Sequence, residues 1–300
     1  MAQLDVLIPH FQDAESLALS LASVRAQTWT GDMRLVIVDD GSPAADFAKV
    51  EQLVAGLDLP VTLRRNPENR GRPYTRNRLL DAVDSPFVSW IDAGDVWYPD
   101  KIERQFEHVS RMRLAGAPLE RTWITCNYDW QWHGGRVRRN RQEVEGRQLR
   151  ELMLGQRLRA YLWTLLAPAE AFRRVGRFDE RLPRLQDLDY FVRFVRGGGQ
   201  LATPPHKGAL CRYHKSDIGR DAAEIRRCNR LIVEKNLPAL QAYGPAFVRT
   251  ITYNAERLSA RYAGNNGARG LTAWYLGRAF VAHPKRALGA LRYNLVRAAG

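Results

Sequence analysis

The sequence of 300 residues predicts an α/β protein with a doubly wound, mainly parallel sheet and a helical C-terminal extension. Three observations support this fold class. Short apolar segments alternate with segments of helical periodicity through residues 1–100, and repeated βα units form parallel sheets. Acidic residues directly follow two of the apolar segments, where ligands of open α/β sheets bind. Residues from Asp221 onward are helical in pattern.

Two βα units follow each other at the start of the chain. Residues 4–8 form a short apolar strand, and apolar side chains then recur at helical spacing over residues 14–27. The second strand, residues 34–38, ends on Asp39 and a polar turn, and residues 44–55 form the second helix. The sequence therefore places an acid at the carboxyl end of a strand.

Two further strands complete the predicted parallel sheet. The third strand covers residues 61–64 and leads into a polar loop and a helix through Leu80. The fourth strand, residues 87–91, is a mainly apolar run that ends on Asp92 and Asp95. Because continuous apolar strands are typical of buried parallel sheets, these two acids are expected at the same edge of the sheet as Asp39.

The pair Asp92 and Asp95 suits a hard divalent cation. Carboxylate oxygens select Mg²⁺ or Mn²⁺, which is usually shared with the phosphates of a substrate. The sequence therefore indicates a metal and diphosphate site at the end of the fourth strand. The alternative is an Asp-Gly turn with solvated acids, because Asp and Gly are common turn residues.

A set of motifs occurs in order within residues 3–216. The motifs are Val6-Leu-Ile-Pro-His-Phe11, Val38-Asp-Asp-Gly-Ser42, Asn69-Arg-Gly71, Thr75-Arg-Asn77, Ile91-Asp-Ala-Gly-Asp-Val-Trp97, Gly176-Arg-Phe-Asp-Glu180 and Gln186-Asp-Leu-Asp189. This ordered set resembles the family 2 glycosyltransferases of GT-A fold. The resemblance implies inverting transfer of a sugar from a nucleotide-diphosphate donor to an acceptor, in bacterial surface polysaccharide biosynthesis, often on lipid-linked acceptors.

The resemblance also implies which residues bind the donor. Asp39 can accept a hydrogen bond from the N–H of a uracil or thymine ring, and Phe11 can cover the face of that ring. Phe11 stands where the family more often has Tyr. The alternatives are a core position for Phe11 and a turn-stabilising role for Asp39. The implied nucleotide-sugar site comprises Pro9, Phe11, Asp39, Asp40, Arg76 and Asp92.

Arginine side chains in and around the motifs Asn69–Gly71 and Thr75–Asn77 offer positive charge to a diphosphate. Arg76 occupies the position where the family has an arginine that can neutralise this group. Its neighbours Arg70, Arg72 and Arg78 are interpreted as solvated charges on the loop and helix. Asp40 is expected to touch the ribose or to stabilise its own turn.

The metal motif departs from the commonest family form, which reads Asp-X-Asp-Asp. Gly94 occupies the third position, and glycine has no side chain to coordinate an ion. Either Asp95 binds the metal, or Asp92 contacts the ribose and the ion is held by fewer protein ligands, water and the diphosphate. His214, in a segment similar to a family segment near the metal, is the third candidate ligand, and the alternative is an ordinary surface or core histidine.

Asp187 is the predicted catalytic base. An inverting transfer needs a carboxylate that deprotonates the acceptor hydroxyl as it attacks the anomeric carbon. A helix over residues 185–195 places Asp187 in its first turn, and the alternative role is a favourable interaction with the helix N-terminus. Gln186 stands where the family usually has Glu, and Asp189 is interpreted as structural.

Composition bounds the remaining properties. We expect a glycosyltransferase domain over residues 1–220, with a donor half over about 1–100 and an acceptor half over about 101–220, and a helical region over 221–300. The three cysteines have no metal-type spacing and suit a reducing cytosol. The chain starts directly in a strand and has no apolar run long enough to span a bilayer, so a cytoplasmic location is expected.

The net charge of +14 and the pI near 10.1 predict an anionic partner. One basic cluster follows an aromatic stem over residues 130–141, which reads as a hairpin on the acceptor side. Another lies with a leucine stripe on a helix over residues 284–297. This helix predicts peripheral binding to the anionic inner face of the cell membrane. The alternative is a leucine stripe that packs on the protein's own core.

Two other function classes remain open at this level. A catalytically silent sugar-nucleotide-binding protein would explain the departures at Gly94 and Gln186. A nucleic-acid-binding protein would use the arginine-rich hairpin and its tryptophans to grip phosphates and stack bases. The acids at three strand ends oppose the second alternative, so no nucleic acid is expected as a partner.

Overall fold

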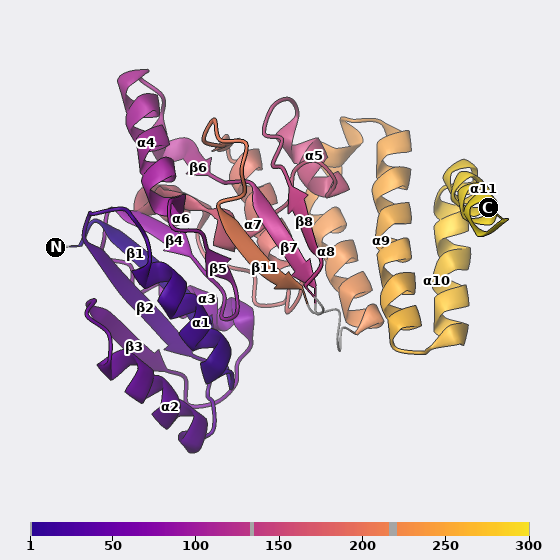
Figure 1. The fold of residues 1–300 in the computed structure, drawn as a ribbon. Helices are drawn as coiled ribbons and strands as arrows, with labels where there is room; N and C mark the ends of the chain where they lie inside the picture. The colour runs from indigo at the N-terminus through magenta and orange to yellow at the C-terminus, as the bar shows by residue number, and fades with distance from the viewer. Residues whose placement is uncertain (1, 133–134, 216–220, 300) are drawn as a thin grey trace. The chain divides into compact units, whose positions relative to one another are not determined.

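The computed structural model describes residues 2–132, 135–215 and 221–299, and the chain divides into two compact units, 1–216 and 217–300. Figure 1 shows an α/β unit followed by a unit of helices only. In the first unit the helices are α1 (Ala14–Arg25), α2 (Ala44–Ala55), α3 (Arg72–Leu80), α4 (Lys101–Leu114), α5 (Gln148–Leu154), α6 (Ala169–Val175) and α7 (Gln186–Arg196).

A seven-stranded sheet forms the centre of the first unit. Its strand order is β10-β6-β9-β4-β1-β2-β3, and β1 to β4 are parallel, as predicted. β9 runs antiparallel to both of its neighbours. The strands are β1 (Leu4–His10), β2 (Met33–Asp39), β3 (Val61–Arg65), β4 (Phe87–Trp90), β6 (Thr122–Ile124), β9 (Leu166–Pro168) and β10 (Gln200–Ala202).

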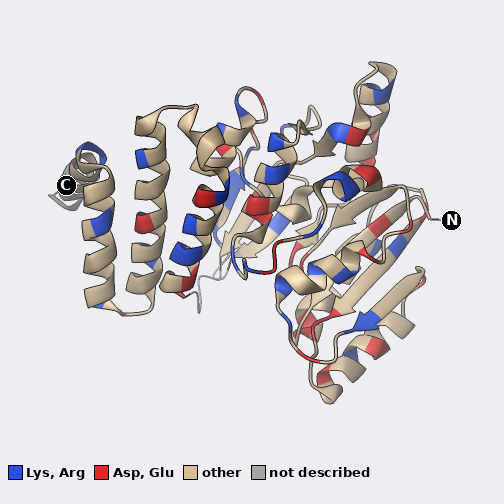
Figure 2. Ribbon diagram, turned by 180° about the vertical axis from the view of Figure 1, so that it is seen from behind, with Lys and Arg blue, Asp and Glu red and all other residues tan. Residues whose placement is uncertain are grey.

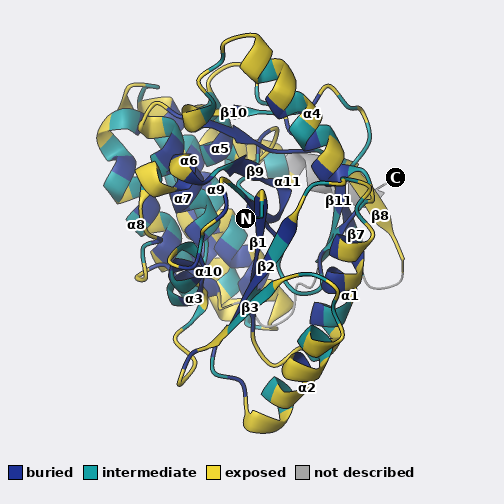
Figure 3. Ribbon diagram, turned by 90° about the vertical axis from the view of Figure 1, so that its left-hand side faces the viewer, coloured by how far each residue is buried: buried dark blue, intermediate teal, exposed yellow. Residues whose placement is uncertain are grey.

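Helices cover both faces of this sheet, which makes the fold doubly wound. Side chains alternate along β1, so that Val6 faces one core and Leu7 the other. The first core also contains apolar residues of α1, α2 and α4, and the second contains those of α3, α5, α6 and α7. Figure 3 shows the central strands largely buried. Because helices cover both faces of the sheet, a ligand can reach the sheet only at the ends of its strands.

A second, four-stranded sheet has the order β5-β11-β7-β8. Its strands are β5 (Val96–Trp97), β7 (Tyr128–Trp132), β8 (Val137–Asn140) and β11 (Cys211–Lys215). β7 and β8 form the predicted hairpin, whose connection includes residues 133–134 outside the described part of the chain. β5 follows the acidic motif directly and pairs antiparallel with β11. This pairing brings a distant segment of the chain to Asp95.

The second unit consists of α8 (Ala222–Gln241), α9 (Pro245–Asn265), α10 (Arg269–Ala282) and α11 (Pro284–Ala299). α9 packs against both α8 and α10. The small core of this second unit contains Ile225, Ala260 and Tyr275. Within the described residues, no helix combines the length and the apolar character that crossing a membrane requires. The helix expected over residues 284–297 corresponds to α11.

Candidate functional site

The carboxyl ends of β1, β2 and β4 meet at one edge of the main sheet. The register pairs His10 of β1 directly with Asp39 of β2. Asp92 follows β4, which lies on the other side of β1. Three polar segments that are far apart in sequence therefore become neighbours simply because the strands are parallel and adjacent.

A buried hydrogen-bond network fixes the carboxylate of Asp39. Its Oδ2 lies 2.8 Å from His10 Nδ1 and 2.6 Å from the Ser42 hydroxyl, and its Oδ1 accepts the Ser42 N–H at 2.8 Å. His10 Nε2 accepts the backbone N–H of Asp13 at 3.2 Å. Because a backbone N–H can only donate, Nε2 is unprotonated, and a neutral His10 therefore carries its proton on Nδ1 and donates it to Asp39.

These contacts also bear on the pKa of Asp39. Burial raises the pKa of this carboxyl, but the hydrogen bonds from His10 and Ser42 outweigh it and lower the pKa below its usual value. Asp39 is therefore an ionised, orientated acceptor. The turn-stabilising role considered for Asp39 is present, and a role toward a nucleotide base is compatible with it.

Asp40 anchors the loop that precedes α3. Its Oδ1 accepts hydrogen bonds from the side-chain amide of Asn66 at 2.8 Å and from the backbone N–H of Arg70 at 3.0 Å. Its Oδ2 accepts the N–H of Gly71 at 2.8 Å. The side chain is 5% exposed. Asp40 thus stabilises the loop before α3 rather than its own turn, and sets where α3 begins.

Phe11 and Pro9 lie at the end of β1. Phe11 is 40% exposed, so the alternative of a core position for its ring is wrong. Pro9 pairs with Val38 in the ladder and is half-buried. The next residue, Gln12, has φ of +55°, an uncommon conformation for a residue with a side chain. The backbone therefore turns sharply at the strand end and leaves the Phe11 ring accessible.

Arg76 of α3 contacts carboxylates from two distant segments of the chain. Its guanidinium is 1% exposed. One terminal nitrogen lies 3.1 Å from both carboxylate oxygens of Asp92, and the other contacts Asp187 Oδ1. The interpretation of Arg76 as a charge that is simply available to a diphosphate is thus incomplete, because two carboxylates already share it.

The carboxylate of Asp187 lies in the first turn of α7, as predicted. Burial raises its pKa, and the guanidinium of Arg76 opposes that rise. Its Oδ2 lies 3.4 Å from the backbone N–H of Leu162. A partly buried carboxyl whose pKa is raised by desolvation, and which pairs with one cation, suits a general base because its affinity for a proton is increased.

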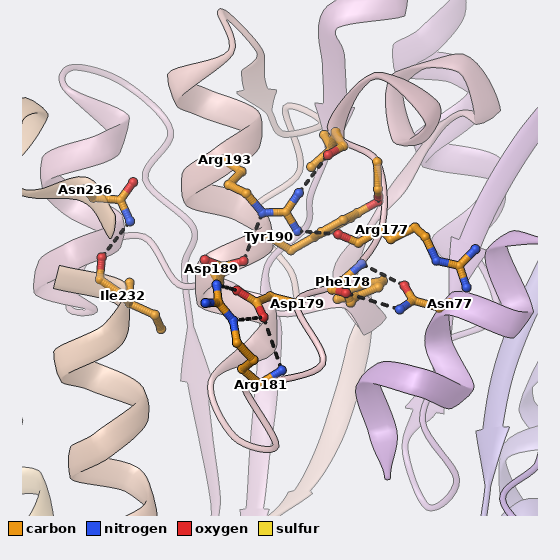
Figure 4. A network of polar contacts seen from close by, with 12 residues as sticks. Asn77, Arg177, Phe178, Asp179, Arg181, Asp189, Tyr190, Arg193, Ile232 and Asn236 are labelled. Carbon is orange, nitrogen blue, oxygen red and sulfur yellow. Dashed lines mark hydrogen bonds and ion pairs between the residues drawn. The ribbon is translucent and has the colours of Figure 1, made fainter. Parts of the chain in front are cut away.

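A polar network holds the loop before α7 in place, as Figure 4 shows. The side-chain amide of Asn77 donates to the Phe178 carbonyl at 3.1 Å and accepts the Phe178 N–H at 2.7 Å. The Arg193 guanidinium donates to the Asp189 carboxylate at 2.9 Å and to the backbone carbonyl of Arg177 at 2.8 Å. The structural role interpreted for Asp189 is therefore present. Since α3 also carries Arg76, this network sets the distance between Arg76 and Asp187.

Backbone strain marks the entrance to α7. Leu185, the N-cap residue, has φ of +59°, and with Gln12 it makes up the described non-glycine residues of positive φ. Such conformations cost about 1–3 kcal/mol and concentrate at functional sites. Asp187 follows two residues later, so the strained turn directs it toward Arg76.

Asp95 is a buried carboxyl beside another carboxyl. It is 3% exposed, and no described residue donates a hydrogen bond to its Oδ2. Burial and the nearby charge of Asp92 raise its pKa well above the usual value, although the His214 backbone N–H acts in the opposite direction. Its Oδ2 atom is therefore the part of Asp95 that is open to a further contact.

Gly94 adopts φ of +94°, which explains why glycine stands in the metal motif. Its N–H donates to the Ser20 hydroxyl at 2.9 Å and to the Ser16 carbonyl at 3.0 Å. An aspartate in this conformation would be strained. At Gly94 the chain therefore forms a turn that α1 holds in place.

His214 lies beside the acidic motif, where β11 pairs with β5. Its Nδ1 is 2.6 Å from the Gly94 carbonyl, and therefore carries a proton, because a carbonyl oxygen only accepts. Its Nε2 is 3.0 Å from the side-chain oxygen Oε1 of Gln131. A metal ligand needs a bare ring nitrogen, so His214 could ligate only through Nε2 and only after leaving Gln131.

The described residues contain no preformed cluster of three His, Cys, Asp or Glu side chains for a metal. Asp92 and Asp95 nevertheless fit a hard cation, because both offer oxygen and the Asp95 carboxylate lacks a described donor at Oδ2. Mg²⁺ usually keeps several waters and is held by one or two carboxylates plus substrate phosphates. Two protein carboxylates are therefore a sufficient protein contribution.

Residues 5–176 match the family described as glycosyl transferase family 2. This chain belongs to glycosyl transferase family 2. It is therefore a glycosyltransferase, and the expected resemblance and enzyme class are confirmed.

Two relatives of this family 2 glycosyltransferase carry names from polysaccharide biosynthesis. The chain is 37% identical over 114 residues to succinoglycan biosynthesis protein ExoW of Rhizobium meliloti, a match that covers 37% of this chain and 35% of that protein. It is 26% identical over 267 residues to amylovoran biosynthesis glycosyltransferase AmsB of Erwinia amylovora, which covers 86% of this chain and 83% of AmsB.

Solved structures confirm the GT-A fold of the family 2 chain. It matches S. aureus TarS 1-349 in complex with UDP-GlcNAc with a TM-score of 0.67 at 15% identity, over 95% of this chain and 82% of that one. It matches the mannosyltransferase PcManGT from Pyrobaculum calidifontis, in complex with GDP-Man and Mn²⁺, with a TM-score of 0.62 at 18% identity. That match covers 100% of this chain and 81% of PcManGT.

Two candidate site residues of this family 2 glycosyltransferase were missed from the sequence. His10 lies inside the first motif, and its position opposite Asp39 follows from pairing adjacent parallel strands. Arg72 is exposed, as its interpretation as a solvated charge implies, and its charge also interacts with those of Asp92 and Asp187. The signal for Arg72 is its spacing of four residues from Arg76 on α3, which puts both on one face.

Proposed function

We propose that this glycosyltransferase inverts the anomeric centre as it moves a sugar from a nucleotide-diphosphate donor to a hydroxyl of a glycan or lipid-linked acceptor, in surface polysaccharide biosynthesis. A UDP- or dTDP-sugar is the favoured donor. The observation that carries the proposal is the bridge from Asp92 through Arg76 to Asp187, because it couples an acidic donor motif to a base on the acceptor side.

The nucleotide base is read by Asp39 in this proposal. A carboxylate oxygen has two lone pairs, so Oδ1 has capacity for the base N–H beside the Ser42 N–H. The exposed Phe11 ring covers the base, and Pro9 shapes the same strand end. The UDP-GlcNAc complex of TarS supports a nucleotide-sugar donor for this fold.

The diphosphate lies between the acids and the arginines of the site. Asp92 and Asp95 would hold Mg²⁺ or Mn²⁺, which when bound neutralises charge on the leaving nucleoside diphosphate. The Mn²⁺ complex of PcManGT supports this assignment. Arg72, one helical turn before Arg76, adds positive charge on the same side. His214 positions the Gly94 carbonyl and is the third candidate ligand of the metal, through its Nε2.

The chemical step follows from Asp187. Its carboxylate takes the proton of the acceptor hydroxyl while that oxygen attacks the anomeric carbon from the face opposite the diphosphate. The bond from the anomeric carbon to the diphosphate oxygen breaks, and its electron pair leaves with the nucleoside diphosphate. Arg76 holds Asp187 ionised until the proton arrives and keeps its oxygen directed into the site.

A panel of nucleotide sugars with Mn²⁺ tests the proposal. Thermal shift should identify the donor, because a ligand that binds only the native state raises its stability by mass action. Release of nucleoside diphosphate that depends on an acceptor glycan should then follow, with the product anomer assigned by NMR. Binding without any transfer or hydrolysis would favour the catalytically silent alternative, and retention of configuration would contradict the role of Asp187.

We expect His10→Leu to weaken nucleotide binding, because Asp39 loses a buried hydrogen-bond donor. A hydrogen bond to a charged group contributes about 1.5–3 kcal/mol, which corresponds to roughly 10- to 100-fold in Kd. His10→Asn is the matched control, since its amide can donate from nearly the same place as Nδ1. Calorimetry with UDP should show most of the affinity retained in His10→Asn, whereas equal losses in both variants would indicate only a packing role.

We expect Asp95→Asn to abolish stabilisation by Mn²⁺. The substitution removes a buried carboxylate charge that has no described donor at Oδ2, so the metal-free protein should melt at the same or a higher temperature. Thermal melts with and without Mn²⁺ and UDP measure both effects. Asp81→Asn, on an exposed carboxyl paired with Arg177, is the control. A full Mn²⁺ shift in Asp95→Asn would contradict the assignment of this ligand.

A further inference from the structure

α10 exposes apolar side chains around most of its circumference. Tyr275 and Ala279 are its buried residues, and they form one narrow stripe. Val281 is 79% exposed, and large apolar side chains on the rest of the helix are also exposed. These side chains are Leu271, Trp274, Leu276 and Phe280, and Leu288 and Leu291 continue the exposed apolar surface on α11. A helix that is apolar all round is normally buried, so this face calls for a cover.

The charges around this apolar face have one sign. Every charged residue after Glu256 is Lys or Arg: Arg257, Arg261, Arg269, Arg278, Lys285, Arg286, Arg292 and Arg297. Glu256 itself is 4% exposed and lies 2.9 Å from Arg226 and 3.2 Å from Arg278. Its negative charge is therefore neutralised inside the unit. Figure 2 shows α10 with blue segments and no red.

We infer that the outer face of α10, with the start of α11, docks onto an anionic lipid surface. This apolar and basic face is defined here as Leu271, Trp274, Leu276, Phe280 and Val281 with Arg278, Lys285 and Arg286. The inference goes beyond the transfer reaction and does not depend on the donor site. It adds α10 to the helix over residues 284–297 that was expected to bind the membrane. Leu288 and Leu291 of that helix are exposed, so the alternative in which they pack on the protein's own core is wrong for these two residues. The side chains of Arg292, Leu295 and Arg297 lie outside the described residues.

The combination of charges and apolar side chains selects lipid over other occupants. A second copy of this face would bring like charges together, which opposes a symmetric dimer. A nucleic acid would match the charges but leave the apolar side chains uncovered. An anionic bilayer satisfies both, since apolar side chains enter the interface while lysine and arginine side chains lie at the anionic headgroups.

Trp274 has the surroundings of an interfacial anchor. It is half exposed, and the guanidinium carbons of Arg226 and Arg278 lie 5.3 Å and 5.1 Å from its ring centroid. Tryptophan concentrates at the headgroup level of membranes, and arginine extends its charge to the same level while its stem stays on apolar surface. Trp274 and the half-exposed Arg278 thus lie side by side on α10, while Arg278 also pairs with Glu256.

Sedimentation of the full chain with vesicles tests the inference. We expect binding to vesicles that contain phosphatidylglycerol, weak binding to phosphatidylcholine alone, and loss of binding at high salt. The combined variant Leu276→Ser, Phe280→Ser and Val281→Ser should reduce the partition coefficient at least about tenfold. Lys285→Glu with Arg286→Glu should reduce it by a similar factor. Arg113→Glu with Leu114→Ser is the matched control, because both residues are exposed on α4.

Several results would overturn the inference. The first is equal binding to both kinds of vesicle, or binding to neither. The second is full vesicle binding by the serine variant with an unchanged melting temperature. A dimer in light scattering that the serine variant converts to a monomer would show instead that α10 contacts a second copy. Transfer to a soluble acceptor should be unchanged in all these variants, so failure here is distinguishable from failure of the transferase proposal.

Discussion

Replacing Asp187 by Asn should leave a folded protein that binds donor but loses about 10²- to 10⁴-fold of its turnover, the usual effect of removing a general base. The amide keeps the shape of the carboxyl and still accepts a hydrogen bond from Arg76, but it cannot take the proton of the acceptor hydroxyl. Donor affinity should change little, because Asp187 is not among the residues proposed to bind the donor and the amide still accepts from Arg76. Steady-state transfer kinetics and UDP calorimetry measure the two quantities.

Asp189→Asn is the control that separates chemistry from structure. Asp189 lies on the same helical turn and is buried, but it pairs with Arg193 rather than with Arg76. Its replacement should lower the melting temperature and leave kcat within a few-fold of the wild type. Near-normal turnover of Asp187→Asn would remove Asp187 from the role of base. Equal losses in both variants would mean that α7 only supports the site.

The sheet and the strand-end acids could be predicted because local patterns determine them. Apolar strands that alternate with helices imply parallel neighbours, and adjacent parallel strands place Asp39 and Asp92 at one edge. The position of Asp187 followed from a helical pattern and the ordered motifs. In each case, the residue follows directly on its strand or lies within its helix, so little non-local information is needed.

The pairings between distant segments could not be predicted from the sequence. Arg76 and Asp187 are separated by 111 positions, and their contact depends on how Asn77 fixes the loop before α7. β5 has two residues, too few for a pattern, so its pairing with β11 gave no signal. The exposed face of α10 could not be predicted either. An apolar helical pattern alone predicts a buried helix, and only the structure shows that no neighbouring element among the described residues covers this face.

The charge balance at the centre of the site makes Arg76 the most consequential residue after Asp187. Arg76 is buried and is shared by two carboxylates, of which Asp187 is the more buried. Breaking a buried pair by removing one partner typically costs about 3–5 kcal/mol. We expect Arg76→Met to lose free energy of unfolding on this scale near pH 8. The loss should shrink in acid, since a protonated Asp187 no longer needs a cation.

The same substitution should move the pH profile of turnover. Burial raises the pKa of Asp187 and Arg76 opposes that rise, so without Arg76 the pKa climbs further. A base works in its deprotonated form, and activity is lost as the pH falls through its pKa. The acidic limb of kcat should therefore shift to higher pH by roughly 1–3 units.

Arg76→Lys gives an independent measure of this charge if Arg76→Met folds poorly. A lysine keeps one positive charge but lacks the planar fork that reaches Asp92 and Asp187 together. Its acidic limb should lie between those of the wild type and Arg76→Met, with urea unfolding at pH 5.5 and pH 8 as the parallel stability measurement. An acidic limb that stays at the wild-type position in both variants would show that Arg76 does not control the protonation of Asp187, and the buried bridge would then serve only to hold α3 against α7.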